Sequence, residues 1–133
     1  MVCCSGHILR EFSFPPGDNV EIRPWGAFKT HYLAEDKSVC YKTLWVNTGE
    51  QLSLQYHNKR SELWYIPDEN AVFRMTQGNS VKICRGKNRF DIEVGENHTI
   101  MNMSSLPLVI HETQMGYCDE MDIVRLYDPY NRQ

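Results

Sequence analysis

The segment from Ser53 to Trp64 carries three side chains that can bind a divalent metal ion. Gln55 and His57 are two residues apart, and a β-strand directs side chains i and i+2 to the same face. After a polar Asn-Lys-Arg-Ser turn, Glu62 opens a second apolar strand that can return beside the first. An amide oxygen, an imidazole and a carboxylate that converge from such a hairpin form half of a metal site.

A second histidine supplies the other half of this predicted centre. His98 follows a turn at Gly95 and begins an alternating run that extends to Asn102. The sequence therefore predicts one divalent ion bound by Gln55, His57, Glu62 and His98. Two imidazoles with two oxygen donors suit zinc, cobalt, manganese, iron or nickel. A plainer interpretation also stands, in which Gln55 and His57 lie on the solvated face of a sheet.

The two segments resemble the two motifs of the cupin superfamily. In that superfamily a glycine, here Gly49, precedes a His-x-His pair, a glutamate follows, and a single histidine comes later. Gln55 stands at the first histidine position in this chain. With Leu-Ser-Leu-Gln-Tyr-His and Arg-Ser-Glu-x-Trp around it, the sequence resembles type II phosphomannose isomerases. More narrowly, it resembles the cupin domain that often ends mannose-1-phosphate guanylyltransferase fusion enzymes.

The resemblance extends from about Ile22 to the C-terminus. Five further matches to the family follow in order: Arg23-Pro24-Trp25-Gly26, Lys42, Glu112-Thr113-Gln114-Met115-Gly116, Asp122-Ile123-Val124-Arg125-Leu126 and Asp128-Pro129-Tyr130-Asn131-Arg132. The chain departs from the family at five positions, where histidines, a glycine and a proline are usual: Asn58, Lys59, Leu63, Glu69 and Glu93. Since Asn58 and Lys59 lie in the turn at the mouth of the expected barrel, their change bears on substrate identity and activity.

The pattern of the whole chain is that of an all-β protein. Alternating segments separated by turn residues are predicted to be strands at 26–33, 38–46, 51–55, 63–66, 71–76, 80–83, 91–94, 98–102 and 108–115. Many short strands at regular spacing indicate an antiparallel sandwich or barrel. The motifs imply that this is the single-domain cupin jelly roll, over residues 22–133, preceded by an N-terminal arm over residues 1–21.

Bulk composition excludes several classes of function. The chain has 133 residues, a net charge of −3 and 41% hydrophobic residues, with basic and acidic side chains mixed along it. We therefore expect neither a nucleic-acid partner nor a membrane surface. No apolar run approaches the roughly 18 residues that span a bilayer. Five cysteines, including Cys3 and Cys4, show no C-x-x-C pair, which favours free thiols and a cytoplasmic location.

The strand phase near residue 110 places a carboxylate inside the barrel. If Leu108, Ile110, Glu112 and Gln114 face inward, His111 faces the surface. Burial of the Glu112 carboxylate is costly unless it has a partner or a role in the chemistry of the site. A partner such as Lys42 or Arg60 would make it structural, whereas a pKa near neutrality would make it an acid/base. Trp64 shares the phase of Glu62 and is expected to line the cavity, more by core packing than by sugar stacking.

The resemblance implies a metal-dependent aldose–ketose isomerase that interconverts mannose 6-phosphate and fructose 6-phosphate. Glu112 or Lys42 would be catalytic, and substrate would contact Arg60, Gln114, Arg125, Trp64 and Arg132. The alternative is a non-catalytic, metal-holding cupin that binds a sugar phosphate or nucleotide sugar, or that partners a separate guanylyltransferase. A small iron oxygenase ranks last, because Gln55 replaces one of its usual three histidines. A homodimer is expected, since exposed sheet edges need cover.

Overall fold

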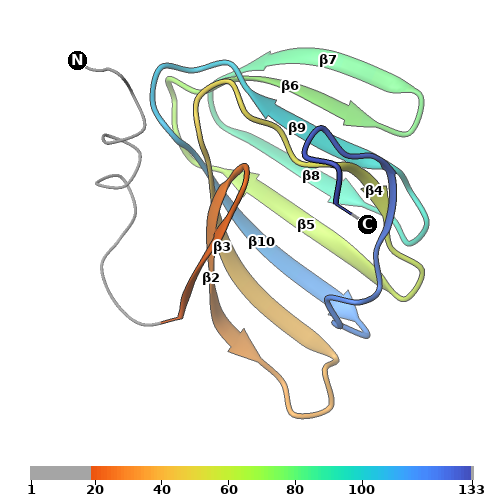
Figure 1. Cartoon of the computed structure of the whole chain (residues 1–133). Coiled ribbons are helices and arrows are strands. Elements are labelled where there is room, and N and C mark those ends of the chain that lie inside the picture. The colour runs from red at the N-terminus through yellow and green to blue at the C-terminus, as the bar shows by residue number, and fades with distance from the viewer. Residues whose placement is uncertain (1–18, 133) are drawn as a thin grey trace.

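Eleven strands form two antiparallel sheets in the computed structural model, which describes residues 19–132 (Figure 1). The strands are β1 (Val20–Arg23), β2 (Gly26–Leu33), β3 (Val39–Val46), β4 (Leu54–Tyr56), β5 (Arg60–Ile66), β6 (Val72–Gln77), β7 (Ser80–Arg85), β8 (Asn88–Ile92), β9 (His98–Asn102), β10 (Leu108–Gly116) and β11 (Val124–Tyr127). The described part of the chain contains no helix, and hence none able to cross a membrane. The predicted all-β class is confirmed.

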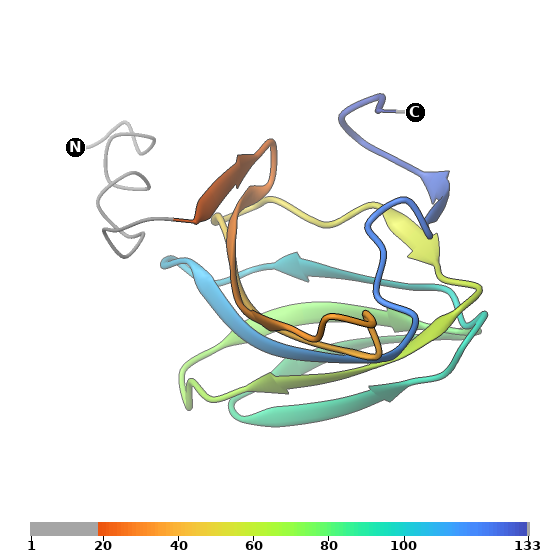
Figure 2. The same cartoon turned by 90° about the horizontal axis from the view of Figure 1, so that it is seen from below.

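The two sheets face each other and enclose the interior, as the view from below shows (Figure 2). One sheet has the order β1-β2-β3-β10-β5-β8, and the other has the order β11-β4-β9-β6-β7. Sequence neighbours β4 and β5 therefore belong to different sheets, so the predicted hairpin at residues 55–62 is wrong. The backbone N–H groups of Asn58 and Lys59 donate to the carboxylate of Asp122. The connection between β4 and β5 thus crosses from one sheet to the other at the rim of the interior.

Strand boundaries follow the alternation of buried and less buried residues. β2 and β9 have the predicted bounds, whereas β5 begins at Arg60 and not at Leu63. The reason is that Arg60 and Glu62 are buried between less buried neighbours, so the alternation continues through polar residues. The sequence pattern did not predict β1 or β11. Cys3, Cys4 and most of the predicted arm lie outside the described residues.

The interior is divided into an apolar half and a polar half. In β10 the inward residues change from Leu108 and Ile110 to Glu112 and Gln114, all of them buried. Antiparallel register places the polar residues of neighbouring strands at the same level: Glu112 pairs with Lys42 in β3 and with Trp64 in β5. The apolar half contains the core, including Phe73, Ile66 and Ile100.

A glycine allows β10 to end against the backbone of β5. Gly116 has a φ of +129° and pairs with Arg60. A Cβ atom at this position would collide with the carbonyl oxygen of Lys59. Only glycine tolerates both the positive φ and the close approach. This contact fixes the start of β5, from which two charged side chains enter the interior.

Candidate functional site

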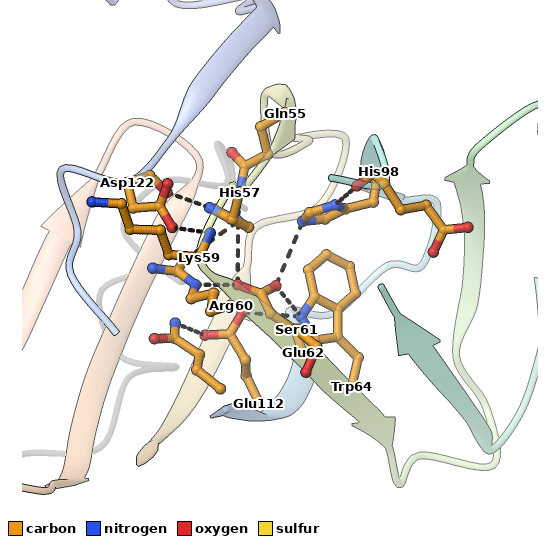
Figure 3. Close-up of polar contacts among 12 residues, drawn as sticks. Gln55, His57, Lys59, Arg60, Ser61, Glu62, Trp64, His98, Glu112 and Asp122 are labelled. Carbon is orange, nitrogen blue, oxygen red and sulfur yellow. Dashed lines mark hydrogen bonds and ion pairs between the residues drawn. The ribbon is translucent and has the colours of Figure 1, made fainter. Parts of the chain in front are cut away.

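Three buried side chains converge in the polar half of the interior (Figure 3). His57 Nε2 lies 3.2 Å from Glu62 Oε2, and His98 Nε2 lies 3.5 Å from Glu62 Oε1. Each of the three residues is at most 2% exposed. One ligand atom from each lies within 4.8 Å of the others, which is the spacing of a candidate metal site. The structure thus brings together three of the four predicted ligands, from three separate segments.

Both imidazoles are held in the same tautomer. His57 Nδ1 lies 2.6 Å from the backbone oxygen of Asp122, and His98 Nδ1 lies 2.9 Å from that of Glu96. A carbonyl oxygen only accepts hydrogen bonds, so each Nδ1 donates. When the ring is neutral, each Nε2 then carries the lone pair and faces Glu62. Backbone carbonyls commonly orient metal-binding histidines in this way.

The residues present fit a divalent cation. A neutral Nε2 lone pair that faces a carboxylate oxygen is favourable only when a proton or a cation lies between them. His98 Nε2 has no hydrogen-bond partner among residues 19–132, because the 3.5 Å to Glu62 is too long for a good hydrogen bond. Two imidazoles and a carboxylate are also common ligands of zinc, iron and manganese.

Gln55, the fourth predicted ligand, lies beside this group. Its Oε1 accepts a hydrogen bond from the Ser53 hydroxyl, and its Nε2 lies 3.4 Å from His57 Nε2. In this orientation the amide nitrogen, and not the oxygen, faces the centre. Rotation of the amide by 180° would present Oε1 to the centre, and the Ser53 hydroxyl could then accept from the amide nitrogen.

A buried arginine shares the carboxylate with the histidines. Arg60 Nε donates to Glu62 Oε2 at 2.9 Å, and Nη1 donates to the backbone oxygen of Asp119 at 3.0 Å. Burial would raise the pKa of Glu62, but the facing His98, His57 and Arg60 outweigh burial and hold the pKa well below its usual value. Glu62 is therefore ionised, as a metal ligand must be.

The two histidines differ in their proton affinity. Burial lowers the pKa of His57, and the positive charge of Arg60 adds to this effect against the opposing influence of Glu62. Burial also acts to lower the pKa of His98, but the contact with Glu62 outweighs it and the pKa is raised. His57 is thus the more readily available neutral ligand, and a metal ion would displace a proton from His98.

A cavity of about 120 Å³ adjoins this group, and its wall includes all seven residues predicted to be catalytic or substrate-binding. These residues are Lys42, Arg60, Trp64, Glu112, Gln114, Arg125 and Arg132. Trp64 is fully buried, and its Nε1 donates to Glu62 Oε1 at 3.1 Å and to Glu112 Oε2 at 2.9 Å. The indole therefore links two carboxylates as well as filling the core.

Glu112 is a buried carboxyl group with neutral partners. Its Oε1 accepts from Gln114 Nε2 at 2.7 Å, and its Oε2 accepts from Trp64. Burial and the nearby charge of Glu62 raise the pKa of Glu112 to about 7. In the described residues 19–132, Lys42 and Glu112 do not form an ion pair shorter than 4 Å. Lys42 Nζ lies 4.6 Å from the centre of the Phe28 ring instead.

Comparison with known proteins identifies the family. The model of the family described as "Mannose-6-phosphate isomerase C-terminal" matches residues 18–128. The chain belongs to this family. Over 111 residues it is 36% identical to the xanthan biosynthesis protein XanB of Xanthomonas campestris pv. campestris (strain B100), a match that covers 83% of this chain and 23% of XanB. It is 34% identical to the mannose-1-phosphate guanylyltransferase ManC of Salmonella typhimurium (strain LT2), with 83% and 22% covered.

The family member described here spans less than a quarter of the length of these relatives. Solved structures confirm its cupin fold. The capsular polysaccharide assembling protein CapF from Staphylococcus aureus has a TM-score of 0.66 at 18% identity, with 89% of this chain and 33% of CapF covered. An RmlC-like cupin from Shewanella frigidimarina has a TM-score of 0.60 at 13% identity, with 81% and 94% covered.

Among the described residues, the other two histidines lie away from the centre. His111 and His31 both contact the Thr43 hydroxyl on the outer face of the six-stranded sheet, at 3.1 and 2.7 Å. Sequence analysis missed Asp122, which contacts His57 and the turn after it. Its position within the Asp-Ile-Val-Arg motif was the available signal. Seven further cavity residues were not predicted as site residues: Arg23, Trp25, Phe28, Leu44, Leu52, Glu120 and Ile123.

The raised pKa of Glu112 predicts a specific dependence of stability on pH. The unfolded chain loses this proton near its ordinary value, whereas the folded chain retains it until about pH 7. The stability from the protonated carboxyl is thus present at acid pH and is lost as the pH rises to about 7. Relative to Glu112→Gln, metal-free wild type should lose up to roughly 3 kcal/mol of unfolding free energy across this range.

Urea unfolding of chelator-treated protein at a series of pH values measures this difference. The exposed Glu93→Gln variant is the matched control, and its curve should parallel that of wild type. A Glu112→Gln curve that also parallels wild type would show that Glu112 has the same pKa in the folded and unfolded chain, and would contradict the prediction.

Proposed function

We propose that this protein is a metal-dependent aldose–ketose isomerase that acts on a sugar phosphate of the mannose 6-phosphate/fructose 6-phosphate type. One observation carries the proposal: a buried carboxyl with a pKa of about 7 lines the same cavity as basic side chains, next to a candidate metal triad. Such an isomerisation moves a proton between two neighbouring carbons. It requires a group that accepts and returns a proton near neutral pH.

His57, Glu62 and His98 would hold the metal ion, with Gln55 as the fourth ligand after rotation of its amide. A bound divalent ion would stabilise negative charge on the substrate oxygens. Glu112 would accept the proton from carbon, because a pKa near 7 gives comparable amounts of acid and base at neutral pH. Gln114 and Trp64 hold this carboxyl group in place by hydrogen bonds to its two oxygens.

Basic residues in the cavity wall would bind the phosphate. Lys42, Arg125 and Arg132 line the cavity, and guanidinium and ammonium groups pair well with phosphoryl oxygens. Arg60 also lines it, but Glu62 and the backbone oxygen of Asp119 already occupy two of its donor groups. Its Nη2 in turn lies 3.4 Å from His57 Nε2. A contribution of Arg60 to substrate binding would therefore rest on the remaining N–H groups of its two terminal nitrogens.

A second function is a non-catalytic cupin that holds a metal ion and binds a sugar phosphate or nucleotide sugar. Two observations favour it. Relatives that the chain matches over less than a quarter of their length are named as guanylyltransferases, so a sugar phosphate or nucleotide sugar is a fitting ligand. The exposed Asn58 and Lys59 stand where the family usually has histidines, at the rim of the interior.

The metal centre is tested by removing its ligands one at a time. His57→Ala and His98→Ala should each reduce bound metal from about one ion per chain to a small fraction, because each removes a nitrogen ligand. Elemental analysis after purification and dialysis measures the content. His111→Ala, on the outer face, is the control and should retain wild-type metal content. Full occupancy in both ligand variants would disprove the assignment.

Catalysis is tested by Glu112→Gln, since an amide of the same shape cannot accept the proton. Turnover of mannose 6-phosphate should fall by roughly 10²–10⁴-fold with metal content unchanged. A coupled assay of fructose 6-phosphate formation measures it, with Glu93→Gln as control. Undiminished turnover in Glu112→Gln would transfer the role of base to Lys42. Metal-replete wild type that binds mannose 6-phosphate without converting it would establish the non-catalytic alternative.

We also propose that the protein is a homodimer. Aromatic and aliphatic side chains are 39–44% exposed on the outer face of the six-stranded sheet, among them Tyr41, Tyr65 and Met115. β1 lies at one edge of this sheet, and a second copy would cover that edge. Light scattering should give twice the mass of the chain, and deletion of residues 1–18 should shift it toward monomer. Monomeric wild type at high micromolar concentration would contradict the proposal.

A further inference from the structure

The segment between β10 and β11, residues 117–123, is hydrogen-bonded to the turn that carries the candidate centre. Tyr117 N donates to the backbone oxygen of Lys59 at 2.8 Å, and Arg60 Nη1 donates to the backbone oxygen of Asp119 at 3.0 Å. β11 then pairs with β4, which precedes the turn (Figure 1). Residues 54–60 are thus held along their length by a segment about 65 residues away in sequence.

Asp122 makes three further hydrogen bonds to this part of the chain. Its Oδ1 accepts from Asn58 N at 3.0 Å, and its Oδ2 accepts from Lys59 N at 2.9 Å. Its own backbone oxygen accepts from His57 Nδ1 at 2.6 Å. Figure 3 shows the side chain of Asp122 beside His57 and Lys59. A carboxylate that receives two backbone N–H groups forms strong, charge-assisted hydrogen bonds.

Together these three hydrogen bonds fix the imidazole of His57. Because the carboxylate is tied to the turn, the carbonyl group of the same residue is held at one position relative to His57. That carbonyl requires a proton on Nδ1, which in the neutral ring leaves the lone pair on Nε2. The same hydrogen bonds also set the direction of the imidazole ring, so that Nε2 lies 3.2 Å from Glu62 Oε2.

The second histidine is oriented in a different way. His98 Nδ1 donates to the backbone oxygen of Glu96, two residues before it. The local turn alone provides this contact, so no distant side chain is required. The orientation of His57, in contrast, depends on a side chain from the C-terminal part of the chain.

We propose that Asp122 is the positioning residue for His57. Its carboxylate ties the C-terminal segment to the turn at Asn58 and Lys59 and so maintains the carbonyl that orients the imidazole. The role in metal affinity rests on the proposed metal centre, whereas the role in the tautomer of His57 does not. Loss of a partner that orients a ligand typically lowers metal affinity by about 10–100-fold.

Two variants separate this role from general stability. Asp122→Ala removes both acceptors. Asp122→Asn keeps the shape but turns an NH₂ group toward one of the two backbone donors, so one hydrogen bond is lost. Asp119→Asn is the matched control, because it lies in the same segment and its carboxylate does not contact residues 57–59. Urea unfolding shows which variants remain folded.

The first measurement is the tautomer of His57 in the metal-free, full-length chain, from the ¹⁵N shifts of its ring nitrogens. Wild type and Asp119→Asn should show a single tautomer with the proton on Nδ1. Folded Asp122→Asn should show a mixture in which a substantial share of the proton has moved to Nε2. Wild type without the Nδ1–H tautomer would overturn the proposal even if neither Asp122 variant folds.

The second measurement is zinc affinity, by competition with a chelator of known affinity. Asp122→Asn should bind zinc about 10–100-fold more weakly than wild type and Asp119→Asn. Unchanged tautomer and unchanged affinity in a folded Asp122 variant would refute the positioning role. If wild type itself binds no zinc, the proposed metal centre fails, and a shifted tautomer in Asp122→Asn would still support the role of Asp122.

Discussion

The burial of one ionised carboxylate, that of Glu62, sets the requirements for the surrounding structure. Moving such a charge out of water costs several kcal/mol unless good partners repay it. Glu62 is 2% exposed and receives hydrogen bonds from Arg60 Nε and Trp64 Nε1, with His57 and His98 facing its two oxygens. The same negative charge lies near Glu112 and contributes to its raised pKa. The burial of Glu112, together with this neighbouring charge, thus raises its pKa to about 7.

Antiparallel register allows this polar cluster to coexist with a well-packed core. The inward residues of β3, β5 and β10 are apolar at one end and polar at the other, and pairing aligns the change at one level across all three strands. Ile110 pairs with Leu44 in β3, and the next inward residue, Glu112, pairs with Lys42. A shift of one residue in register would point the polar side chains outward and the outer ones inward. The apolar half therefore secures the register on which the site depends.

Alternation along the chain was sufficient to predict the class of fold, the bounds of β2 and β9 and the inward direction of Glu112. The motif spacing was sufficient to select His57, Glu62 and His98. Pattern alone failed where the chain changes sheets, because the connection at Asn58 and Lys59 has the composition of a hairpin turn. Its path is decided by hydrogen bonds to Asp122, about 60 residues later, and local sequence contains no information on such contacts. The pairing of Arg60 with Glu62 was missed for the same reason, since it is visible only in the folded structure.

The changes at Asn58 and Lys59 affect the mouth of the site and not its centre. Both residues bind Asp122 through backbone N–H groups, and every residue except proline offers one. Their side chains are exposed, and Lys59 Nζ lies 5.5 Å from the centre of the Tyr117 ring at the surface. Substitution at these positions can therefore alter what the rim contacts while the ring of His57 stays oriented. Within this fold, the chemistry of the rim can change independently of the geometry of the candidate metal centre.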